Sequence, residues 1–596
     1  MRKLAAWVLV LGMAMSPAVM AADGNDKTSD AKTDKSSTNT NTAKTNGTAP
    51  TSTELEAEIE QLRALLKEQA DQLAAMKAAM ANGSTANAGT TTSTAANSTP
   101  ASGSTVASSD ATDSPTMAAS AAPAAGSATT SAAKKPVTMS TDPQAMNASD
   151  HSPLSFKIGD AQFTPGGFMD FTSVFRTTGT GNGIGTTFNG IPFINNSAGI
   201  ASTPETRFSA QNSRISLKVD APVAGGNITG YVEADFLGAI AQNANVTSNS
   251  DSFRMRLYFG DYRRGKWEVL AGQDWSMLTP SRKGLGVMPA DVFFTQNMDT
   301  NYQVGLPWTR QPQFRVMYHP SDEWTMGVSV ENPDEFLFST SNVGLPAAFT
   351  PFEGQLDATS GGTLATPPTP NWLPDFIFKV ANDHMFGDKL FHIEASGLLS
   401  EFRIFTPSSI TTTTGITSHA TGGGGSVNMN LELFKNFRLI ANSFFSDGGG
   451  RYLLGSGPDL VVKQLTTTSP FLPSLVHAYS GIGGFEYQVT KKTLLDAYYG
   501  AAYYGRDVQI NPVGGAPNLG YGFNGASTAV AGAQNRIIDE YTIGWTQTLW
   551  GNPNYGSLKI ITQGSYLSRT PWFVPTGQPR DAHLFMVYAD LRYTLP

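Results

Sequence analysis

The sequence predicts an all-β protein: a transmembrane antiparallel β-barrel, preceded by an α-helical coiled coil on a disordered linker. Segments in which apolar and polar residues alternate run from about residue 165 to the end of the chain. The connections between them are by turns short and long, which is typical of bacterial outer-membrane barrels. After the first 22 residues no stretch is apolar over the roughly 20 residues that a membrane helix needs. A membrane form of this chain must therefore be a barrel.

The amino-acid composition further limits the class of protein to which this chain can belong. The chain has 596 residues, a formal net charge of −8, no cysteine and 15% charged residues, against about 25% in soluble domains. The lack of cysteine excludes disulfide frameworks and thiolate metal sites. The acidic balance, without a long Lys/Arg run, argues against nucleic acid as a partner.

The chain begins with a targeting segment. Residues 1–3 supply positive charge, residues 4–15 are apolar, and residues 16–22 form a small-residue cleavage zone. This pattern predicts a signal peptide over residues 1–22. Residues 23–52 are a Lys/Asp/Ser/Thr/Asn tract with almost nothing to bury, so we expect a disordered polar segment.

Residues 53–81 show a heptad pattern, begun by a capping box at Thr53 and Glu56 and ended by Asn82-Gly83. We expect a periplasmic helix that associates with copies of itself, because a single amphipathic helix of this length is marginally stable. The predicted oligomerisation positions are Leu55, Ile59, Leu62, Leu66, Gln69, Leu73, Met76 and Met80. Residues 82–152 are predicted to be a flexible Ser/Thr/Ala-rich linker, and residues 153–596 the outer-membrane barrel.

About sixteen strands follow from the period-two alternation. We place them at residues 165–177, 205–221, 227–239, 252–262, 266–276, 311–319, 324–331, 372–383, 389–405, 418–434, 437–446, 475–489, 493–505, 536–550, 557–569 and 581–595.

Loop length follows strand parity. Tight connections at residues 221–226, 263–265, 320–322, 435–436, 491–492 and 551–553 alternate with long loops such as 178–204, 277–310 and 332–371. Short turns mark the periplasmic side of outer-membrane barrels, so both ends of the barrel are expected there, with the coiled coil beneath. A barrel of this size is expected to enclose a water-filled lumen.

The hairpin over residues 207–237 defines the two faces of the wall. In it, Ile215, Leu217 and Val219 oppose Arg214 and Lys218, and Val232 and Phe236 oppose Glu233 and Asp235. The apolar face should meet lipid or a neighbouring subunit, and the charged face water. In the next strand the alternation predicts that Phe253, Met255, Leu257 and Phe259 share the apolar face, opposite Arg254, Arg256, Tyr258 and Gly260.

The charged face predicts the pore wall. The predicted pore-lining residues are Arg214, Lys218, Glu233, Asp235, Arg254, Arg256 and Arg315. These charges could select ions, or could form cross-strand pairs worth about 0.2–1 kcal/mol each; the sequence leaves both open. Arg254 and Arg256 are the favoured solute-binding pair, because two guanidinium groups on one face can engage carboxylates bidentately.

The long loop at residues 277–310 is a candidate constriction. It has apolar anchors and four charges, Arg282, Lys283, Asp291 and Asp299, and charge at a constriction sets selectivity. The alternative is an extracellular lid or an oligomer-contact loop.

The sequence gives no catalytic, cofactor or metal motif. Of seven histidines only His384 and His392 are close in sequence, and Glu394 shares a face with His392. We interpret them as ordinary wall residues, and predict a protein that is not an enzyme, with no cofactor and no metal.

Several short motifs, in order, resemble the DcaP-like porins: residues 166–171 (GGFMDF), Ser213-Arg214, residues 233–236 (EADF) and residues 272–276 (GQDWS) before a long loop. The resemblance covers the first third of the barrel and the overall layout. It implies a trimeric outer-membrane channel with an N-terminal coiled coil that admits small anions such as dicarboxylates. No binding residue of that family maps onto this chain.

These observations predict a porin in the outer membrane of a Gram-negative-type bacterium, for passive diffusion of small hydrophilic solutes, favouring small anions. The expected partners are membrane lipid, further copies of the chain, and peptidoglycan or periplasmic proteins. A sugar or peptide channel is one alternative. A structural tether between outer membrane and cell wall is another, and an outer-membrane hydrolase is a distant third.

Overall fold

The computed structural model describes residues 152–180, 183–195, 199–238, 252–337, 343–356, 371–411, 414–454, 456–523 and 534–596, together with Lys67. The predicted signal peptide, disordered segment, coiled coil and linker lie outside these residues, apart from Lys67 in the coiled coil and Ser152 at the end of the linker. No helix within the described residues is long and apolar enough to cross a membrane.

The strands form one closed antiparallel barrel, because β2 pairs with β4 on one side and with β22 on the other. When β3 and β4 are counted as one strand and the three-residue β1 (Phe156–Ile158) is left out, sixteen strands surround the interior, as predicted. They are β2 (Ala161–Arg176), β3 with β4 (Glu205–Ser209, Arg214–Val223), β5 (Gly226–Asp235), β6 (Arg254–Arg264), β7 (Trp267–Trp275), β8 (Arg310–Tyr318), β9 (Trp324–Glu331), β10 (Asp375–Phe386), β11 (Lys389–Thr406), β12 (Ile416–Phe434), β13 (Phe437–Asp447), β16 (His477–Thr490), β17 (Thr493–Tyr504), β20 (Asn535–Asn552), β21 (Gly556–Pro571) and β22 (Ala582–Thr594).

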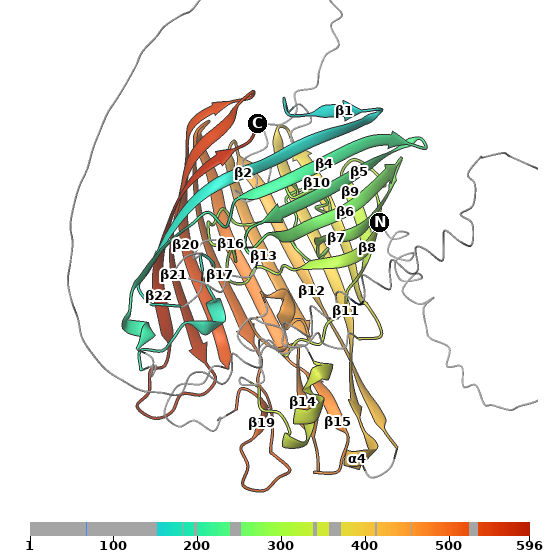
Figure 1. Ribbon diagram of the computed structural model, residues 1–596, viewed down its shortest axis with the longest axis vertical. Coiled ribbons are helices and arrows are strands. Elements are labelled where there is room, and N and C mark those ends of the chain that lie inside the picture. Colours follow the sequence, from blue (N-terminus) through green and yellow to red (C-terminus); the bar gives the residue numbers. More distant parts are fainter. Residues whose placement is uncertain are drawn as a thin grey trace, which may run out of the picture. The chain divides into compact units, whose positions relative to one another are not determined.

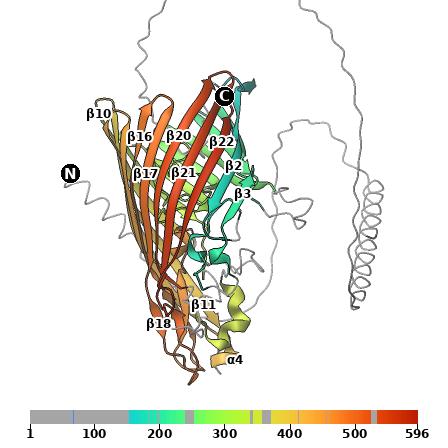
Figure 2. The same ribbon diagram turned by 90° about the vertical axis from the view of Figure 1, so that its left-hand side faces the viewer.

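The barrel has two kinds of wall. Strands β4 to β9 have 8 to 11 residues, and we call them the short wall. Strands β10 to β22 have 11 to 19 residues within the barrel, which we call the tall wall (Figures 1 and 2). A tilted strand needs about 9–11 residues to cross a membrane. The short wall therefore just spans it, whereas much of the tall wall extends beyond.

The short turns lie at one end of the barrel with the C-terminus, at the top of Figure 1. There Ser152 Oγ donates a hydrogen bond to the Pro596 carbonyl at 2.7 Å. A short strand, β1 (Phe156–Ile158), folds back onto the start of β2 beside it. The long loops lie at the opposite end, so the predicted parity of the connections is observed.

The second wall strand is interrupted, which the sequence did not predict. Between β3 and β4 the chain leaves the ladder at residues 210–213. Side chains replace the missing backbone bonds. Ser213 Oγ accepts from the Asp170 backbone N–H at 3.0 Å, and Asn212 Nδ2 donates to the Asp170 carboxylate at 2.8 Å.

The outer surface carries the apolar face. Ile215, Val232 and Phe236 are exposed, whereas Glu233 and Asp235 on the same hairpin are buried inside. The two faces of that hairpin are as predicted. The same alternation extends around the tall wall, where the exposed apolar residues include Tyr499, Tyr541, Ile543, Phe585 and Leu591.

The predicted faces of β6 are wrong beyond Arg256. A register shift between Glu233 and Ala234 on β5 gives β6 one extra residue, a β-bulge. Leu257 and Phe259 are consequently buried in the interior, while Tyr258 is 44% exposed on the outside. A bulge shifts the alternation by one position, so each residue after it changes face.

The interior is more filled than the predicted water-filled lumen. The segment 276–309 between β7 and β8 supplies fully buried apolar side chains, among them Leu278, Phe293, Phe294 and Met298. This segment fills the interior because its apolar side chains gain free energy when they are removed from water.

The long loops contain unpredicted regular elements. These are the hairpins β14–β15 (Leu460–Gln464, Phe471–Leu475) and β18–β19 (Asp507–Gln509, Leu519–Tyr521), the 3-10 turns η1 (Phe188–Gly190), η2 (Ile200–Ser202), η3 (Ala347–Gln355) and η4 (Gly450–Tyr452), and the helix α4 (Ser408–Thr411).

Candidate functional site

The segment 276–309, which we call the inward loop, begins and ends on the short wall. The Ser276 backbone N–H donates to the Thr309 carbonyl at 2.9 Å, closing its base. Four aromatic rings pack above this base: Phe294 stacks on Tyr302 with ring centroids 4.1 Å apart, and both lie against Trp275 and Trp308. These rings hold the loop inside the barrel by removing large apolar surfaces from water.

The first half of the loop forms a narrow tip. Ser281 pairs with Val292 in an isolated antiparallel bridge, and the Phe293 N–H donates to the Pro280 carbonyl at 2.8 Å. Gly284 and Gly286 have φ angles of +58° and +61°, which side chains other than glycine rarely tolerate. The chain can therefore reverse within residues 281–292.

Side chains of the tall wall hold this tip through hydrogen bonds to the backbone of the tip. Lys379 Nζ donates to the Thr279 carbonyl at 2.7 Å, and the Ser281 N–H donates to Glu394 at 2.9 Å. The Gly284 N–H donates to Asp383 at 2.9 Å. These wall groups are themselves paired, since His392 lies between Asp383 and Glu394 at 2.7 and 3.2 Å.

Arg282 makes the strongest side-chain connection between loop and wall. Its two terminal nitrogens bind the Glu486 carboxylate on β16 at 2.8 and 2.7 Å. Arg438 also reaches Glu486, at 3.4 Å, and the Tyr498 hydroxyl donates to it at 2.9 Å. Arg282 and Glu486 are almost completely buried, so this ion pair is screened little by water.

The second half of the loop crosses to β20, β21 and β22. Gln563 accepts from the N–H groups of Met298 and Asp299 at 2.6 and 3.0 Å, and Glu540 accepts from the Val304 N–H at 3.0 Å. Tyr588 donates to Asp299 at 3.0 Å. Burial raises the pKa of Asp299, and the charge of Arg176 acts against that rise. The inward loop thus contacts interior side chains from the short wall round to β22.

Most of the predicted pore-lining charges form one ion-pair network on the short wall. Arg254 binds Asp235 through two nitrogens at 2.9 and 2.7 Å. Arg256 binds Glu233 at 2.6 Å and Asp235 at 2.8 Å, and Arg214 lies 3.6 Å from Glu233. The structure therefore brings five of the seven predicted residues together.

The other two predicted wall residues lie elsewhere. Lys218 pairs with Asp220 at 3.1 Å toward the short-turn end. Arg315 is fully buried, lies 3.6 Å from Asp274, and donates to the Leu285 and Trp275 carbonyls at 3.2 and 2.8 Å. Arg315 therefore supports the base and tip of the inward loop.

Arg310 was not predicted, and it adjoins the network. Its guanidinium lies over the Trp275 ring at 5.5 Å, and Arg256 lies over the same ring at 5.5 Å. Within the described residues no ion pair or hydrogen bond reaches the side chain of Arg310. Of the four arginines at this end of the wall, Arg254 and Arg310 are partly exposed, and Nη1 of Arg310 is buried.

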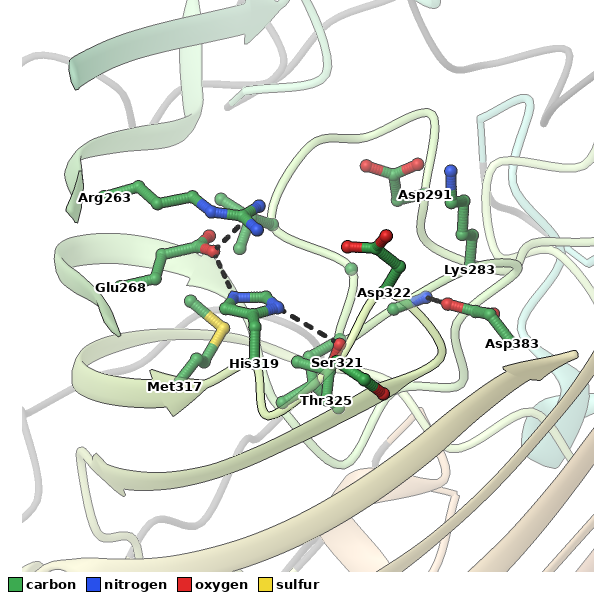
Figure 3. Close-up of a pocket in the computed structure, with 14 residues that line it drawn as sticks. Arg263, Glu268, Lys283, Asp291, Met317, His319, Ser321, Asp322, Thr325 and Asp383 are labelled. Atoms are coloured by element: carbon green, nitrogen blue, oxygen red, sulfur yellow. Dashed lines mark hydrogen bonds and ion pairs between the residues drawn. The ribbon is translucent and has the colours of Figure 1, made fainter. Parts of the chain in front are cut away.

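Two adjoining cavities, of about 420 and 410 Å³, lie beneath the tip at the short-turn end. We call them the inner vestibule. Figure 3 shows the side chains that line the first of these cavities. Lys283 and Asp291 line it from the loop, and Arg263, Glu268 and His319 from the wall. Glu268 binds His319 at 2.6 Å and lies 3.7 Å from Arg263.

The four predicted loop charges are therefore separated. Lys283 and Asp291 line the vestibule, Arg282 is inserted into the wall, and Asp299 lies against β22. Burial raises the pKa of Asp291 to about 6, while the charge of Lys283 acts in the opposite direction.

The partners of the loop were not identified from the sequence. Asp383, Glu394, Glu486 and Glu540 all occupy interior positions of alternating strands. The same period-two pattern that located the short-wall charges would have located these. Within the described residues no group of histidine and carboxylate side chains is arranged to hold a metal ion.

No protein-family model and no curated protein matches this sequence. Solved structures do match in fold. The crystal structure of the outer-membrane channel DcaP of Acinetobacter baumannii is similar over 74% of this chain and 99% of its own, at 16% identity and a TM-score of 0.51. An anion-selective porin from Comamonas acidovorans matches over 73% and 99%, at 10% identity and a TM-score of 0.39. OmpT of Vibrio cholerae matches over 74% and 99%, at 10% identity and 0.37. The likeness to DcaP confirms the predicted barrel fold.

Proposed function

We propose that this chain is an outer-membrane porin through which small hydrophilic solutes diffuse passively. The observation that carries the proposal is a closed barrel with an apolar outer surface whose interior is crossed by a charged loop. The fold likeness to an outer-membrane channel supports it. The proposal involves no catalysis and no cofactor.

The test is conductance. Purified barrel added to a planar lipid bilayer should produce discrete current steps in KCl. Absence of steps with correctly folded protein, judged by its heat-modifiable migration on a gel, would contradict the proposal.

We assign the constriction to the inward loop, with Lys283 and Asp291 facing the permeating solute. The loop's contacts on opposite walls support this role over that of an extracellular lid. Replacing Lys283 by glutamate should shift the reversal potential in a salt gradient toward cation selectivity. An unchanged reversal potential would remove this residue from the constriction.

A preference for small anions such as dicarboxylates is the finer part of the proposal. The partly exposed Arg254 and the neighbouring Arg310 support it. The bidentate pairing of Arg254 with Asp235, and of Arg256 with two carboxylates, weakens it, because these guanidinium groups already have anionic partners. Cation preference in bilayers would contradict the anion assignment, and unchanged selectivity in Arg254→Ala would exclude that residue.

We further propose that the chain assembles as a trimer in the outer membrane, with the predicted coiled coil in the periplasm. A structural tether is the second candidate, favoured by the long segment that precedes the barrel. Deleting residues 23–152 separates them. A channel retains its conductance, whereas a tether loses its connection to peptidoglycan, measured as the amount of barrel that sediments with cell walls.

A further inference from the structure

Two groups of charged side chains, at opposite ends of the short wall, differ in their balance of charge. At the long-loop end, four arginines surround two carboxylates, which we call the outer arginine cluster. Its members are Arg214, Arg254, Arg256, Arg310, Glu233 and Asp235. Arg254 and Arg310 begin their strands and Asp235 ends its own, so the cluster lies where the solute would enter from outside.

The inner vestibule has the reverse balance. Three cations line its two cavities, Lys218, Arg263 and Lys283, against five carboxylates, Asp261, Glu268, Asp291, Asp322 and Asp383. His319 and His392 bind Glu268 and Asp383. Within the part of the chain that the structure describes, no hydrogen bond or ion pair reaches the carboxylate of Asp291 or of Asp322.

We propose that the pore is polarised along its axis, with an anion-attracting outer entrance and a cation-attracting inner vestibule, and therefore rectifies ionic current. When the short-turn side is positive, cations enter through the vestibule and anions through the arginine cluster. Both ions then accumulate between the two clusters and the conductance rises. At the opposite polarity both are withdrawn and the conductance falls. The inference rests on the proposed channel function.

Ionic strength gives the first test. The Debye length is about 10 Å at 0.1 M salt and about 3 Å at 1 M. In 0.1 M KCl we expect a conductance about twofold larger with the short-turn side positive, because charged pore walls concentrate counterions. In 1 M KCl the currents should be symmetrical. Symmetrical currents at 0.1 M would overturn the inference, whereas a lack of any current would overturn the proposed function instead.

Because the chain contains no cysteine, a cysteine can be introduced at one chosen position. Such variants test which end of the pore attracts cations and which attracts anions. Ser321→Cys lies in the vestibule, and Gln311→Cys lies one residue from Arg310. A cationic thiol reagent should react faster than an anionic one at position 321, and more slowly at position 311. The reaction rates of the two reagents should differ about fivefold or more, because an excess of two charges several ångströms away has an effect of this size in water. The same preference at both positions would contradict the polarity.

Neutral variants connect the rectification to particular residues. Arg310→Gln and Asp322→Asn should each reduce it, and neither change breaks a hydrogen bond or ion pair of the described residues, so the barrel should still fold. Asp388→Asn is the matched control, because Asp388 is an exposed carboxylate on the same rim that lines neither cavity. Rectification that is unaffected by Arg310→Gln and Asp322→Asn, or equally reduced by Asp388→Asn, would refute the assignment.

Discussion

The short wall and the tall wall follow the same alternation but differ in what their interior faces bind. On the short wall most of the charges bind one another, as in the Arg256 contacts with Glu233 and Asp235, although Arg315 also donates to the inward loop. On the tall wall they bind the inward loop, as in the contacts from Lys379 and Glu486. Burying a charge is tolerated only where a partner is supplied. The short wall supplies its own partners, and the tall wall obtains some of them from a loop that begins on the opposite side.

We expect the two walls to respond differently to the deletion of a single residue. This difference is the largest effect that we predict. Strand β6 carries a bulge, so deleting Arg256 leaves a strand that alternates without interruption. Strand β13 pairs with β16 without a bulge. Deleting Ser443 there would turn Arg438 and Asn442 toward lipid, at a cost that for an arginine ranges from about 2–4 kcal/mol at mid-membrane to about 0–1 kcal/mol near the interface.

We therefore expect the Arg256 deletion to refold into a heat-modifiable barrel and the Ser443 deletion to lose most of the folded band on a gel. Ser443→Ala is the control for the lost side chain. Equal refolding of the two deletions would show that the walls do not differ in this way.

A smaller effect should follow from removing one partner of the buried Glu486 pair. Glu486→Gln leaves Arg282 and Arg438 buried with a neutral partner, which should cost about 3–5 kcal/mol of unfolding free energy. Glu323→Gln, at a half-exposed pair with His384, should cost under about 1 kcal/mol. Urea unfolding in lipid vesicles, followed by tryptophan fluorescence, measures both. A loss of equal size in the two variants would mean that the loop is not held by this carboxylate.

The wall strands could be predicted from the sequence because their signal is local. Alternation and turn residues are visible within a few positions, so β9 was placed with its observed bounds at Trp324 and Glu331. The bulge at Arg256 could not be predicted in this way, because the inserted residue has no distinctive type and only the pairing with β5 reveals it. The break at residues 210–213 was missed for a similar reason, since it depends on bonds to Asp170, about forty positions earlier.

The candidate site was predicted only in part, again because its contacts join residues that are far apart in the sequence. The inward loop was recognised by its length and its apolar residues. Its partners on the tall wall, such as Glu486 with Arg282, are 204 positions away, and no local pattern pairs them. The pairing of Arg254 with Asp235 was left open beside the solute-binding interpretation, because a sequence alone shows charges on one face without their distances.

An intermediate effect is expected from the aromatic base of the inward loop. Phe294→Ala removes a fully buried ring that stacks on Tyr302, and should cost about 3 kcal/mol while letting the loop move from the pore. Phe314→Ala, on the lipid face of β8 and 50% exposed, is the matched control. Single-channel recording should show larger and noisier conductance for Phe294→Ala alone. Unchanged conductance would mean that the loop does not limit the current.

The smallest predicted effect is a change of selectivity with pH. Burial raises the pKa of Asp291 to about 6, above the value of about 3.9 expected in the unfolded chain. The folded state therefore binds this proton more tightly. The stabilisation that the proton gives is complete below about pH 4 and is lost as the pH rises through 6. Over the same range the vestibule gains one negative charge.

Lowering the pH from 7.5 to 5 should therefore move the reversal potential in a KCl gradient toward anion selectivity, with a midpoint near 6. Glu268, Lys283, His319 and Asp383 also face the vestibule. Asp291→Asn separates Asp291 from these groups, because it removes this one carboxylate and leaves the others in place. If the midpoint persists in that variant, the titrating group is not Asp291, and the vestibule's charge at neutral pH must come from the wall rather than from the loop.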